Sequence, residues 1–458
     1  MSYMFIGILI LVNIIQACTL RLSGTPHNQV ILENTMSTEY LAAPQIRNLA
    51  QEYKNRLMQI AAGFSFLSIG LLFISYESIF LTFFWILLFS SMIALFFCKV
   101  HYVRKMQELL IANDWLMPVK PILVDTQLIL VKNQKMVSGW WLLPPLLVWI
   151  LGSIYSVLSR FEASWLMIIL SGVFLFLSFG SWLIVGKLPV RALTDNRSIN
   201  QQYNDLTKHH WSLMMVSISW VLIPLLFIPA ISLSVAPALE MILLAFFFLL
   251  IISWTIFSFW YLYSLRKKQD QLLAQVPSYR YLGDDQYWRF GVYYNPNDPR
   301  LFIPSRMGMN MGLNLGRPVG KLLMGLTGII IVVAFVVTLV PAYLYDFTAN
   351  PFQYEQTATN IELKAPFVTT SDIPLDTIEK VELLEKLPNN ITKLYGSATN
   401  NYAAGKFTVD GKAATLYVDH QTKQILHIVT PTRDYYYTNK QPQKTADAYQ
   451  QLQRVMEQ

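Results

Sequence analysis

Eight long apolar segments constrain this chain more than any other feature of its sequence. A helix needs about 20 mostly apolar residues to cross the hydrocarbon core of a bilayer. Hydrophobic residues make up 54% of the chain and charged residues only 14%, against about 25% charged residues in a typical soluble domain. We therefore predict an α-helical polytopic membrane protein with about eight transmembrane helices. The segments are residues 3–20, 59–75, 79–98, 139–158, 164–186, 211–235, 239–264 and 322–345.

Basic residues are concentrated in alternate connections between these segments. One set of connections holds 23 Lys and Arg residues, whereas the other holds a single one, Arg160. The positive-inside rule places the basic set in the cytoplasm. We therefore expect a multi-pass plasma-membrane protein whose N-terminus and C-terminus both lie outside the cytoplasm. The basic set comprises residues 21–58, 99–138, 187–210 and 265–321, and the other set 76–78, 159–163 and 236–238.

The first apolar segment resembles both a membrane helix and a signal peptide. Ile15-Gln16-Ala17-Cys18 is a loose match to a lipoprotein cleavage site, but the segment lacks the basic region with which signal peptides begin. Cleavage at Cys18 would also leave four basic residues, from Arg21 to Arg56, outside the cytoplasm. We therefore expect the first span to be retained.

Two cytoplasmic connections show regular patterns. After a short strand or turn from residue 29, apolar side chains recur at helical spacing, which predicts an amphipathic helix that leads into the second span. Such a helix fits the anionic surface of the inner leaflet or a solvated linker equally well. Residues 120–137 alternate around Asp125-Thr126-Gln127, which predicts a β-hairpin. The apolar positions of the helix are Ile46, Leu49, Tyr53 and Leu57.

Residues 284–318 form the most distinctive connection. Two aromatic runs typical of strands flank the turn sequence Asn295-Pro-Asn-Asp-Pro299. Residues 307–316 then alternate between apolar side chains and Gly or Asn, which is the period of a β-strand. The glycines spaced four apart from Gly308 to Gly320 also fit a helix–helix contact, but that pattern explains only the glycines. We predict a small cytoplasmic β-element of three strands directly before the last span.

Thirteen residues of this connection form a recognisable pattern: Trp288, Gly291, Tyr293, Asn295, Pro296, Asp298, Pro299, Arg300, Pro304, Gly312, Asn314, Arg317 and Pro318. The pattern resembles a short bacterial domain of unknown function found in multi-pass membrane proteins of Gram-positive bacteria. Residues 32–56 resemble the first loop of the same proteins. Some relatives are grouped with SdpI-type immunity and signalling membrane proteins, although this chain lacks the Pro-x-His-x-Asn signature of the better-known members. The resemblance implies an immunity or signalling role and brings no established chemistry.

Residues 346–458 differ in composition from the rest of the chain. Short β-prone runs replace the long apolar ones, Asp410-Gly411 marks a hairpin, and an amphipathic helix follows at about 445–457 with Tyr449, Leu452, Val455 and Met456 on one face. Seven short strands and a final helix are the plan of a pleckstrin-homology domain, a barrel with one open end plugged by a helix. The runs lie near 359–368, 377–385, 391–398, 405–410, 413–418, 424–430 and 434–438.

The residues from Ile373 to Leu383, Gly396, Gly405-Lys406-Phe407, Leu416-Tyr417-Val418 and Thr445 resemble a bacterial pleckstrin-homology-like domain. Eukaryotic relatives of the fold bind phosphoinositides through a basic loop. Residues 346–458 carry 11 basic and 13 acidic residues with no basic cluster, so that role does not transfer. We expect instead a peptide or protein taken at a strand edge or barrel rim. Tyr435-Tyr436-Tyr437 is the most conspicuous surface candidate, and ordinary alternation in an edge strand is the alternative.

These features predict four regions: residues 1–283 with seven membrane helices, 284–318 with the β-element, 319–345 with the last helix, and 351–458 with the extracytoplasmic domain. No charged residue lies deep in a predicted span, and no catalytic, metal-binding or phosphate-binding motif is found, so we expect neither an enzyme nor a cofactor. Adjacent His209 and His210 fit interfacial anchoring better than a metal site.

We therefore expect a non-enzymatic membrane protein with a receptor, immunity or envelope-signalling role. Its expected partners are the lipid bilayer, a peptide or protein outside and a cytoplasmic protein, with no nucleic acid. The alternative is a transporter or permease subunit for an apolar or lipid-like substrate. The candidate binding residues are Trp288, Tyr293, Asn295, Asp298 and Arg300 in the β-element and Tyr435, Tyr436 and Tyr437 in the C-terminal domain.

The predicted topology is checked by reporters fused after Gln458. We expect a reporter that is active only outside the cytoplasm to be active there, because eight spans return the chain to the side on which it began. The matched control is a reporter that is active only in the cytoplasm. Its activity at the same position would mean that the number of spans is odd and that both folded regions face the cytoplasm.

Overall fold

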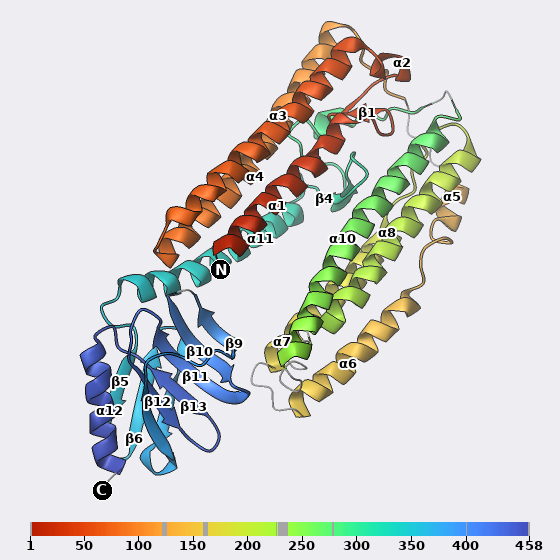
Figure 1. Ribbon diagram of the computed structural model, residues 1–458. Helices are drawn as coiled ribbons and strands as arrows, with labels where there is room; N and C mark the ends of the chain where they lie inside the picture. Colours follow the sequence, from red (N-terminus) through yellow and green to blue (C-terminus); the bar gives the residue numbers. More distant parts are fainter. Residues whose placement is uncertain are drawn as a thin grey trace. The chain divides into compact units, whose positions relative to one another are not determined.

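The computed structural model describes residues 2–120, 126–158, 164–225, 227, 237–276, 279–399 and 401–456. The chain divides into two compact units. The larger unit comprises residues 12–63 and 90–327, and the smaller unit comprises residues 1–11, 64–89 and 328–458. Figure 1 gives the labels of the helices and strands in both units.

Seven helices in the described part of the chain are long and apolar enough to cross a membrane. Each coincides with a predicted segment, so the chain is a membrane protein with seven candidate spans. The remaining segment, 211–235, begins in helix α8 (Arg197–Leu225), but residues 226 and 228–236 lie outside the described residues. Eight spans therefore stay a prediction. The seven are Tyr3–Gly24, Pro44–Phe73, Glu77–Ala112, Gly139–Leu158, Met167–Lys187, Ala245–Leu273 and Pro318–Phe347.

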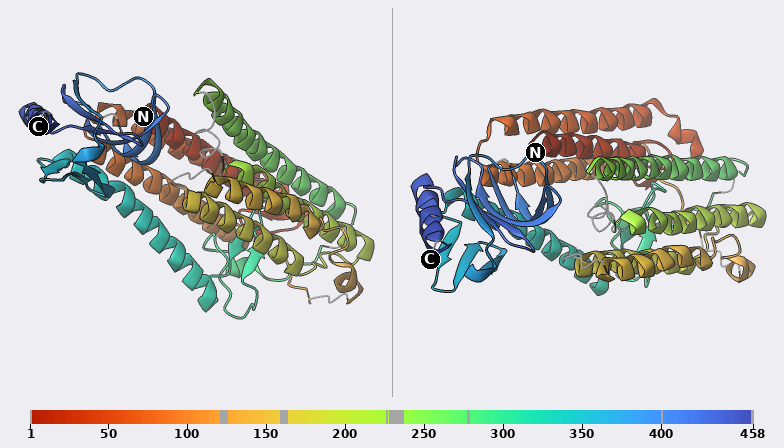
Figure 2. Two further views of the ribbon diagram at one scale, coloured as in Figure 1. Left: turned by 90° about the horizontal axis from the view of Figure 1, so that it is seen from below. Right: turned by 60° about the horizontal axis from the view of Figure 1, so that its bottom comes forward.

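Four helices of the larger unit, α6 (Leu143–Leu158), α7 (Ser164–Lys187), α8 and α10 (Pro237–Leu273), pack side by side, as Figure 2 shows for α7, α8 and α10. Apolar side chains fill the centre of this packing, and hydrogen bonds also join the helices, such as the one from the indole nitrogen of Trp254 in α10 to the hydroxyl of Ser217 in α8 at 3.1 Å. The buried centre includes Val185, Trp211, Met214, Leu262 and Leu265.

A second core of the larger unit lies between helices α3 (Pro44–Ile69) and α4 (Glu77–Ala112), near the end of α1 (Ser2–Arg21). The predicted amphipathic helix is the first half of α3. Its apolar side chains at 46, 49, 53 and 57 are all buried, in one cluster with Tyr102 and Met106 of α4. This face is therefore covered by protein, and it is available neither to the leaflet surface nor to solvent. The short strands β1 (Val30–Ile31) and β2 (Asn34–Thr35) and helix α2 (Thr38–Leu41) precede it.

The hairpin predicted at 120–137 is wrong where the structure describes it. Residues 121–125 lie outside the described residues, and Thr126–Val131 form a short helix, α5. Leu128 of this helix is almost fully buried. Tertiary packing therefore decides the local structure here, as it commonly does for short segments of high β-propensity.

The β-element before the last span has two strands, not three. Strands β3 (Phe302–Pro304) and β4 (Met311–Leu313) pair antiparallel, with Ile303 opposite Gly312. The first aromatic run forms a 3₁₀ turn, η4 (Asp285–Tyr287), followed by tight turns. Its backbone hydrogen bonds mostly join residues three apart in the chain instead of residues of a neighbouring strand. Within the alternating stretch only β4 is a strand. The stretch is not helical, so its glycines do not form the helix–helix contact that was the alternative. Helix α11 (Pro318–Phe347) begins five residues after β4.

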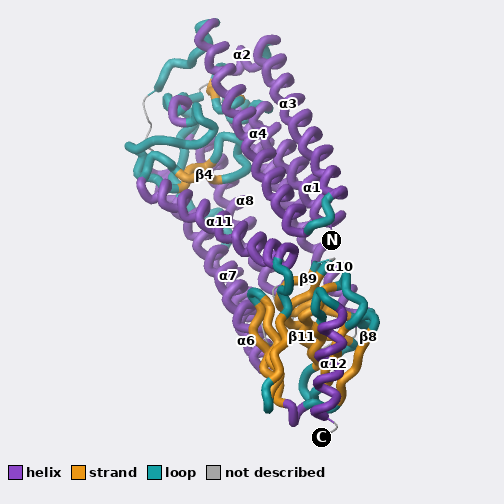
Figure 3. The backbone as a smooth tube through the Cα atoms, turned by 90° about the vertical axis from the view of Figure 1, so that its left-hand side faces the viewer, coloured by secondary structure: helices purple, strands orange, loops and turns teal. Residues whose placement is uncertain are grey.

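The described residues of the smaller unit form nine strands, two more than predicted. Figure 3 draws strands in orange. Strands β5 (Gln353–Gln356), β6 (Asn360–Ala365) and β7 (Val368–Pro374) form one antiparallel sheet. A second sheet has the order β8-β12-β13-β11-β10-β9, in which only β11 and β13 run parallel. Asp410 and Gly411 have positive φ angles in the predicted hairpin turn between β10 and β11. The six strands are β8 (Lys380–Leu384), β9 (Ile391–Ala398), β10 (Tyr402–Val409), β11 (Lys412–Asp419), β12 (Ile425–Val429) and β13 (Asp434–Tyr437).

The six-stranded sheet buries apolar side chains on both faces. One face packs with the three-stranded sheet and with the final helix α12 (Pro442–Met456), which contributes Ala448 and Leu452. Val455 and Met456, predicted on that apolar face, are instead exposed. Leu384 of β8 and Ile391 of β9 contact the cluster on the other face, so the two edges curl around it. Neither sheet closes on itself through hydrogen bonds among the described strands, so the predicted barrel is confirmed only as a sheet-rich domain with a packed helix.

Candidate functional site

Asn314 braces the turn that carries the family-like motif. Its side-chain oxygen accepts hydrogen bonds from the backbone nitrogens of Asn295 (3.0 Å) and Gly316 (3.0 Å). Its side-chain nitrogen donates to the carbonyls of Asn295, Asp298 and Arg300 at 2.9, 3.1 and 3.2 Å. Because the side chain is fully buried, leaving those backbone groups without it would be costly. Asn314 therefore fixes the shape of the turn from Asn295 to Arg300.

The five predicted binding residues of this element lie together, but they bind one another. Trp288 and Tyr293 are buried with their ring centroids 5.2 Å apart. The hydroxyl of Tyr293 donates to the carboxylate of Asp298 at 2.8 Å and accepts from the amide of Asn295 at 3.3 Å. The guanidinium of Arg300 donates to both oxygens of Asp298. These groups hold the element together, and whether a ligand also uses them stays a prediction.

The charge of Asp298 is stabilised from inside the element. Burial opposes ionisation of this carboxyl, but hydrogen bonds from Arg300 and Tyr293 outweigh burial and lower its pKa. Burial is also the main cause that raises the pKa of Tyr293 to about 12. Asp298 is therefore an anion and Tyr293 a neutral donor over the physiological range, which matches the hydrogen bond between them.

A buried ion pair connects the first loop to α4. The carboxylate of Glu33 lies 2.6 Å from the ammonium of Lys99, and their side chains are only 2% and 7% exposed. Lys99 also donates to the carbonyl of Gly291 in the β-element at 3.4 Å. An ion pair at this depth is strongly destabilising to break, because one partner is left as an uncompensated buried charge. The pair therefore fixes where the first loop lies on α4.

The turn that presents Glu33 has an unusual backbone. Leu32 and Glu33 link β1 and β2 and both have positive φ angles, of 47° and 60°. Two-residue hairpins of this kind favour Asn-Gly, because a side chain with φ above zero costs about 1–3 kcal/mol. Here a buried Leu32 and the Glu33–Lys99 ion pair offset that cost. Such a strained turn at buried charges is the reason we regard this region as a candidate site.

Arg306 connects the β-element to the same loop. Its guanidinium lies 2.5 Å from carboxylate oxygens of both Asp284 and Asp285, and it donates to the carbonyl of Glu33 at 2.6 Å. Asp285 in turn accepts from the backbone nitrogen and the hydroxyl of Thr35 at 2.8 and 2.7 Å. Burial alone would lower the pKa of Arg306, but the two aspartates outweigh burial and raise it. The carboxylates of Asp284 and Asp285 are therefore both paired with Arg306 inside the protein.

His27 and Arg266 attach the loop to α10. The ring of His27 lies 3.0 Å from the carboxylate of Asp270, and burial lowers its pKa despite that contact. Arg266 donates to four backbone carbonyls, those of Leu22, Thr25, Pro26 and Met307. We call the set Glu33, Lys99, Asp284, Asp285, Arg306, His27, Asp270 and Arg266 the buried charge cluster. In the part of the chain that the structure describes, no group of three His, Cys, Asp or Glu side chains could hold a metal ion.

Sequence reasoning did not select the buried charge cluster. Members in contact lie up to 273 residues apart in the chain, and each is an ordinary titratable residue outside the predicted spans. The one signal that pointed to it was the resemblance of residues 32–56 and 288–318 to two parts of the same proteins. The structure brings those two stretches into contact through Glu33, Lys99 and Arg306.

The C-terminal domain is joined to α11 by a second polar contact region. Lys440 donates to the carbonyls of Tyr345 (2.9 Å), Asp346 (3.3 Å) and Thr348 (2.9 Å) at the end of the helix. Tyr345 itself lies in the core of the domain, with its ring centroid 4.3 Å from that of Tyr402. Asp346 accepts from the backbone nitrogen of Ser78 at 2.7 Å, which ties the start of α4 to the same place. We call these contacts the α11 joint.

The tyrosines predicted at the surface of the domain lie inside it. Strand β13 is flanked by β12 and β11, so it is not an edge strand. Tyr436 and Tyr437 are both 2% exposed, on opposite faces of the sheet, and Tyr435 is partly buried. Tyr436 stacks on His427 with a centroid separation of 4.3 Å. The alternation of the three side chains is confirmed, but the expectation of a surface patch is wrong, because β13 is central.

Replacing Gly316 with alanine is expected to destabilise the larger unit. A Cβ at this position would lie 2.3 Å from the backbone carbonyl carbon of Asn295, so the turn that Asn314 braces would have to move. Overpacking of this kind costs about 1–3 kcal/mol. The measurement is the thermal unfolding midpoint of the purified protein in micelles. Gly312→Ala is the matched control, because nothing lies within 4 Å of the added Cβ. Equal midpoints for the two variants would contradict the prediction.

The Glu33–Lys99 ion pair is tested by a double-mutant cycle. Glu33→Gln and Lys99→Met are each expected to cost about 3–5 kcal/mol of stability, and the double variant much less than their sum, because it leaves no unpaired buried charge. Unfolding midpoints of the four proteins are compared. The control cycle uses Glu52 and Lys105, an exposed pair 3.3 Å apart that also joins α3 to α4 and is expected to show little coupling. Additive effects at Glu33 and Lys99 would refute the argument.

Two regions of the chain match known families. Residues 352–453 match the family model described as Bacterial PH domain, and residues 296–321 match a family of unknown function, DUF5808. No curated protein and no solved structure matches the chain. The pleckstrin-homology-like region and the domain of unknown function are thus confirmed, and the grouping with SdpI-type or Gram-positive proteins stays a prediction. The chain is a membrane protein that carries a bacterial PH domain at the end of its last apolar helix.

Proposed function

We propose that this protein is a non-enzymatic membrane receptor with an envelope-signalling or immunity role. Its bacterial PH domain takes a peptide or protein outside the plasma membrane, and α11 conveys the bound state towards the cytoplasmic β-element. The α11 joint is the single observation that carries the proposal. It makes the last turn of the helix part of the domain's own fold.

The joint couples the domain to the helix through both packing and charge. The carbonyls at a helix C-terminus lack intrahelical partners and carry partial negative charge, so a cation there is stabilising. Lys440 supplies that cation from the segment between β13 and α12. Tyr345 supplies an aromatic ring to the domain core and donates its hydroxyl to the carbonyl of Pro366 at 2.7 Å. A shift of the domain core therefore acts directly on the end of α11.

The edge strand β9 offers a place for a peptide. Among the described strands, β9 forms ladder hydrogen bonds with β10 alone, whereas β10, β11, β12 and β13 are each paired on both sides. An extended peptide gains affinity at such an edge from main-chain hydrogen bonds and specificity from alternate side chains. At the opposite edge, β8 contacts α12, which leaves less room there. The proposed ligand is therefore an extended peptide segment that adds a strand beside β9.

The test starts from the full chain in lipid nanodiscs. A displayed library of random peptides is selected against it and counter-selected against empty nanodiscs. An enriched peptide is expected to slow amide hydrogen exchange in residues 391–398 and to change it in residues 340–348. Failure to enrich any peptide, or slowed exchange only outside residues 352–453, would overturn the proposal.

Lys440→Met separates binding from coupling. This variant removes the cation from the end of α11 and leaves β9 unchanged, so it is expected to keep peptide affinity while the exchange change in residues 340–348 is lost. Lys444→Met is the matched control, because this lysine is exposed on α12. A Lys440→Met protein that responds like the control would show that the α11 joint does not transmit binding.

A further inference from the structure

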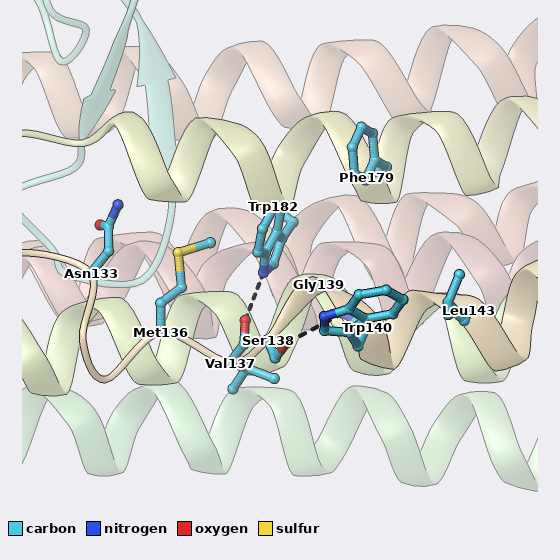
Figure 4. Close-up of a pocket in the computed structure, with 9 residues that line it drawn as sticks. All are labelled: Asn133, Met136, Val137, Ser138, Gly139, Trp140, Leu143, Phe179 and Trp182. Carbon is cyan, nitrogen blue, oxygen red and sulfur yellow. Dashed lines mark hydrogen bonds between the residues drawn. The ribbon is translucent and has the colours of Figure 1, made fainter.

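A groove of about 580 Å³ opens between the C-terminal half of α7 and the start of α6 with the segment before it. Figure 4 shows Trp182 and Phe179 of α7 on one side and the segment from Val137 to Trp140 on the other. The groove lies within the larger unit and shares no residue with the buried charge cluster or the α11 joint. Neither of the matched family regions covers it.

Specific contacts hold the groove open in one shape. The indole nitrogen of Trp182 donates to the carbonyl of Val137 at 2.8 Å, and the backbone nitrogen of Val137 donates to the hydroxyl of Ser212 at 2.8 Å. Gly139 lets the ring of Trp182 approach, because a Cβ there would lie 3.0 Å from it. The wall from Val137 to Gly139 is thus fixed to both α7 and α8, and the groove is preformed.

The two ends of the groove differ in polarity. Trp140, Leu143 and Phe179 line it and are 75%, 42% and 45% exposed, which is the character of a surface covered by lipid chains. Asn133 and Ser138, which also line it, are polar and exposed. The hydroxyl of Ser138 accepts from the backbone nitrogen of Trp140 and keeps its hydrogen to donate. The lining therefore matches a molecule with an apolar tail and a polar head.

Two exposed lysines lie next in the chain to residues that line the groove or pack against its lining. Lys135 is exposed and lies between the lining residues Asn133 and Met136 in the chain. Lys187, also exposed, follows Gly186, on which a Cβ would lie 3.6 Å from Met136. Asp205 is an acidic group close enough to Lys135 to interact with it, so two basic side chains and one acidic side chain lie near this end. The polar end therefore favours an anion.

We propose that this groove binds a phospholipid with an anionic head group. One acyl chain lies along Trp140, Leu143 and Phe179, and the phosphate lies between Lys135, Lys187 and the hydroxyl of Ser138. Three features select this occupant over a neutral lipid or a soluble anion: the apolar floor, the basic polar end, and the position of both at the ends of two apolar helices. Basic pockets between membrane helices on the cytoplasmic side commonly take such head groups.

The experiment uses the full chain in micelles with lipids that carry a photoreactive diazirine in one acyl chain. Phosphatidylglycerol with this probe is expected to label peptides that contain residues 136–143 and 179–187 and to label them more than phosphatidylcholine does. Lys135→Gln combined with Lys187→Gln is expected to weaken phosphatidylglycerol binding roughly 30-fold, since each basic residue near such a head group contributes about a factor of five to six. Trp140→Ala is expected to weaken labelling by both lipids.

Two controls make the outcome decisive. Lys423→Gln combined with Lys444→Gln removes the same charge from the bacterial PH domain and is expected to leave labelling unchanged. Inorganic phosphate is expected not to compete, and full competition by it would mean that the groove holds a free anion only, which would overturn the proposal. Equal labelling by the two lipids, or labelling spread evenly over all apolar helices, would overturn it as well.

Discussion

The larger unit depends on charged side chains that it buries in ion pairs. Glu33 and Lys99 are almost completely enclosed, and Arg306 is enclosed between two aspartates and the carbonyl of Glu33. In a low-dielectric surrounding each of these charges is tolerated only with its partner in place. The first loop, α4 and the β-element therefore take one arrangement together. The positive φ angles at Leu32 and Glu33 persist because this surrounding holds them.

The residues of the family-like motif have a structural role in this arrangement. Trp288, Tyr293 and Asp298 read as exposed recognition residues when only their types are considered. In the fold they are inside, and Asn314 satisfies the backbone of the turn that they occupy. The motif is therefore a compact self-braced turn, and Lys99 attaches it to α4 through the carbonyl of Gly291. A turn that is rigid in this way, placed directly before α11, is suited to hold the start of that helix.

The smaller unit places its own constraint on α11. Tyr345 belongs both to the helix and to the core of the bacterial PH domain. Lys440 donates hydrogen bonds to three carbonyls at the helix end. The helix continues without a break from Pro318 to Phe347, although it contains Pro341. The C-terminal end of this helix is thus fixed by the domain that follows it, as the proposed receptor role requires.

Patterns that extend over many residues predicted the structure better than patterns confined to a few residues. The seven candidate spans, the buried face of α3 and the bacterial PH domain follow from apolar runs, helical spacing and strand–turn signals that extend over many residues. The short helix at Thr126–Val131 and the missing third strand of the β-element show the opposite case. In such segments a single contact, such as burial of Leu128 or packing of Trp288 against Tyr293, outweighs local propensity.

The sequence by itself determined that this chain spans a membrane and ends in a sheet-rich domain, because burial of apolar surface leaves few other solutions for such runs. It could not show that Glu33 meets Lys99, that Lys440 meets the end of α11, or that Tyr436 is covered by neighbouring strands. Those contacts join residues far apart along the chain, and only the tertiary structure decides them, since a charge or a ring becomes buried only through what packs around it.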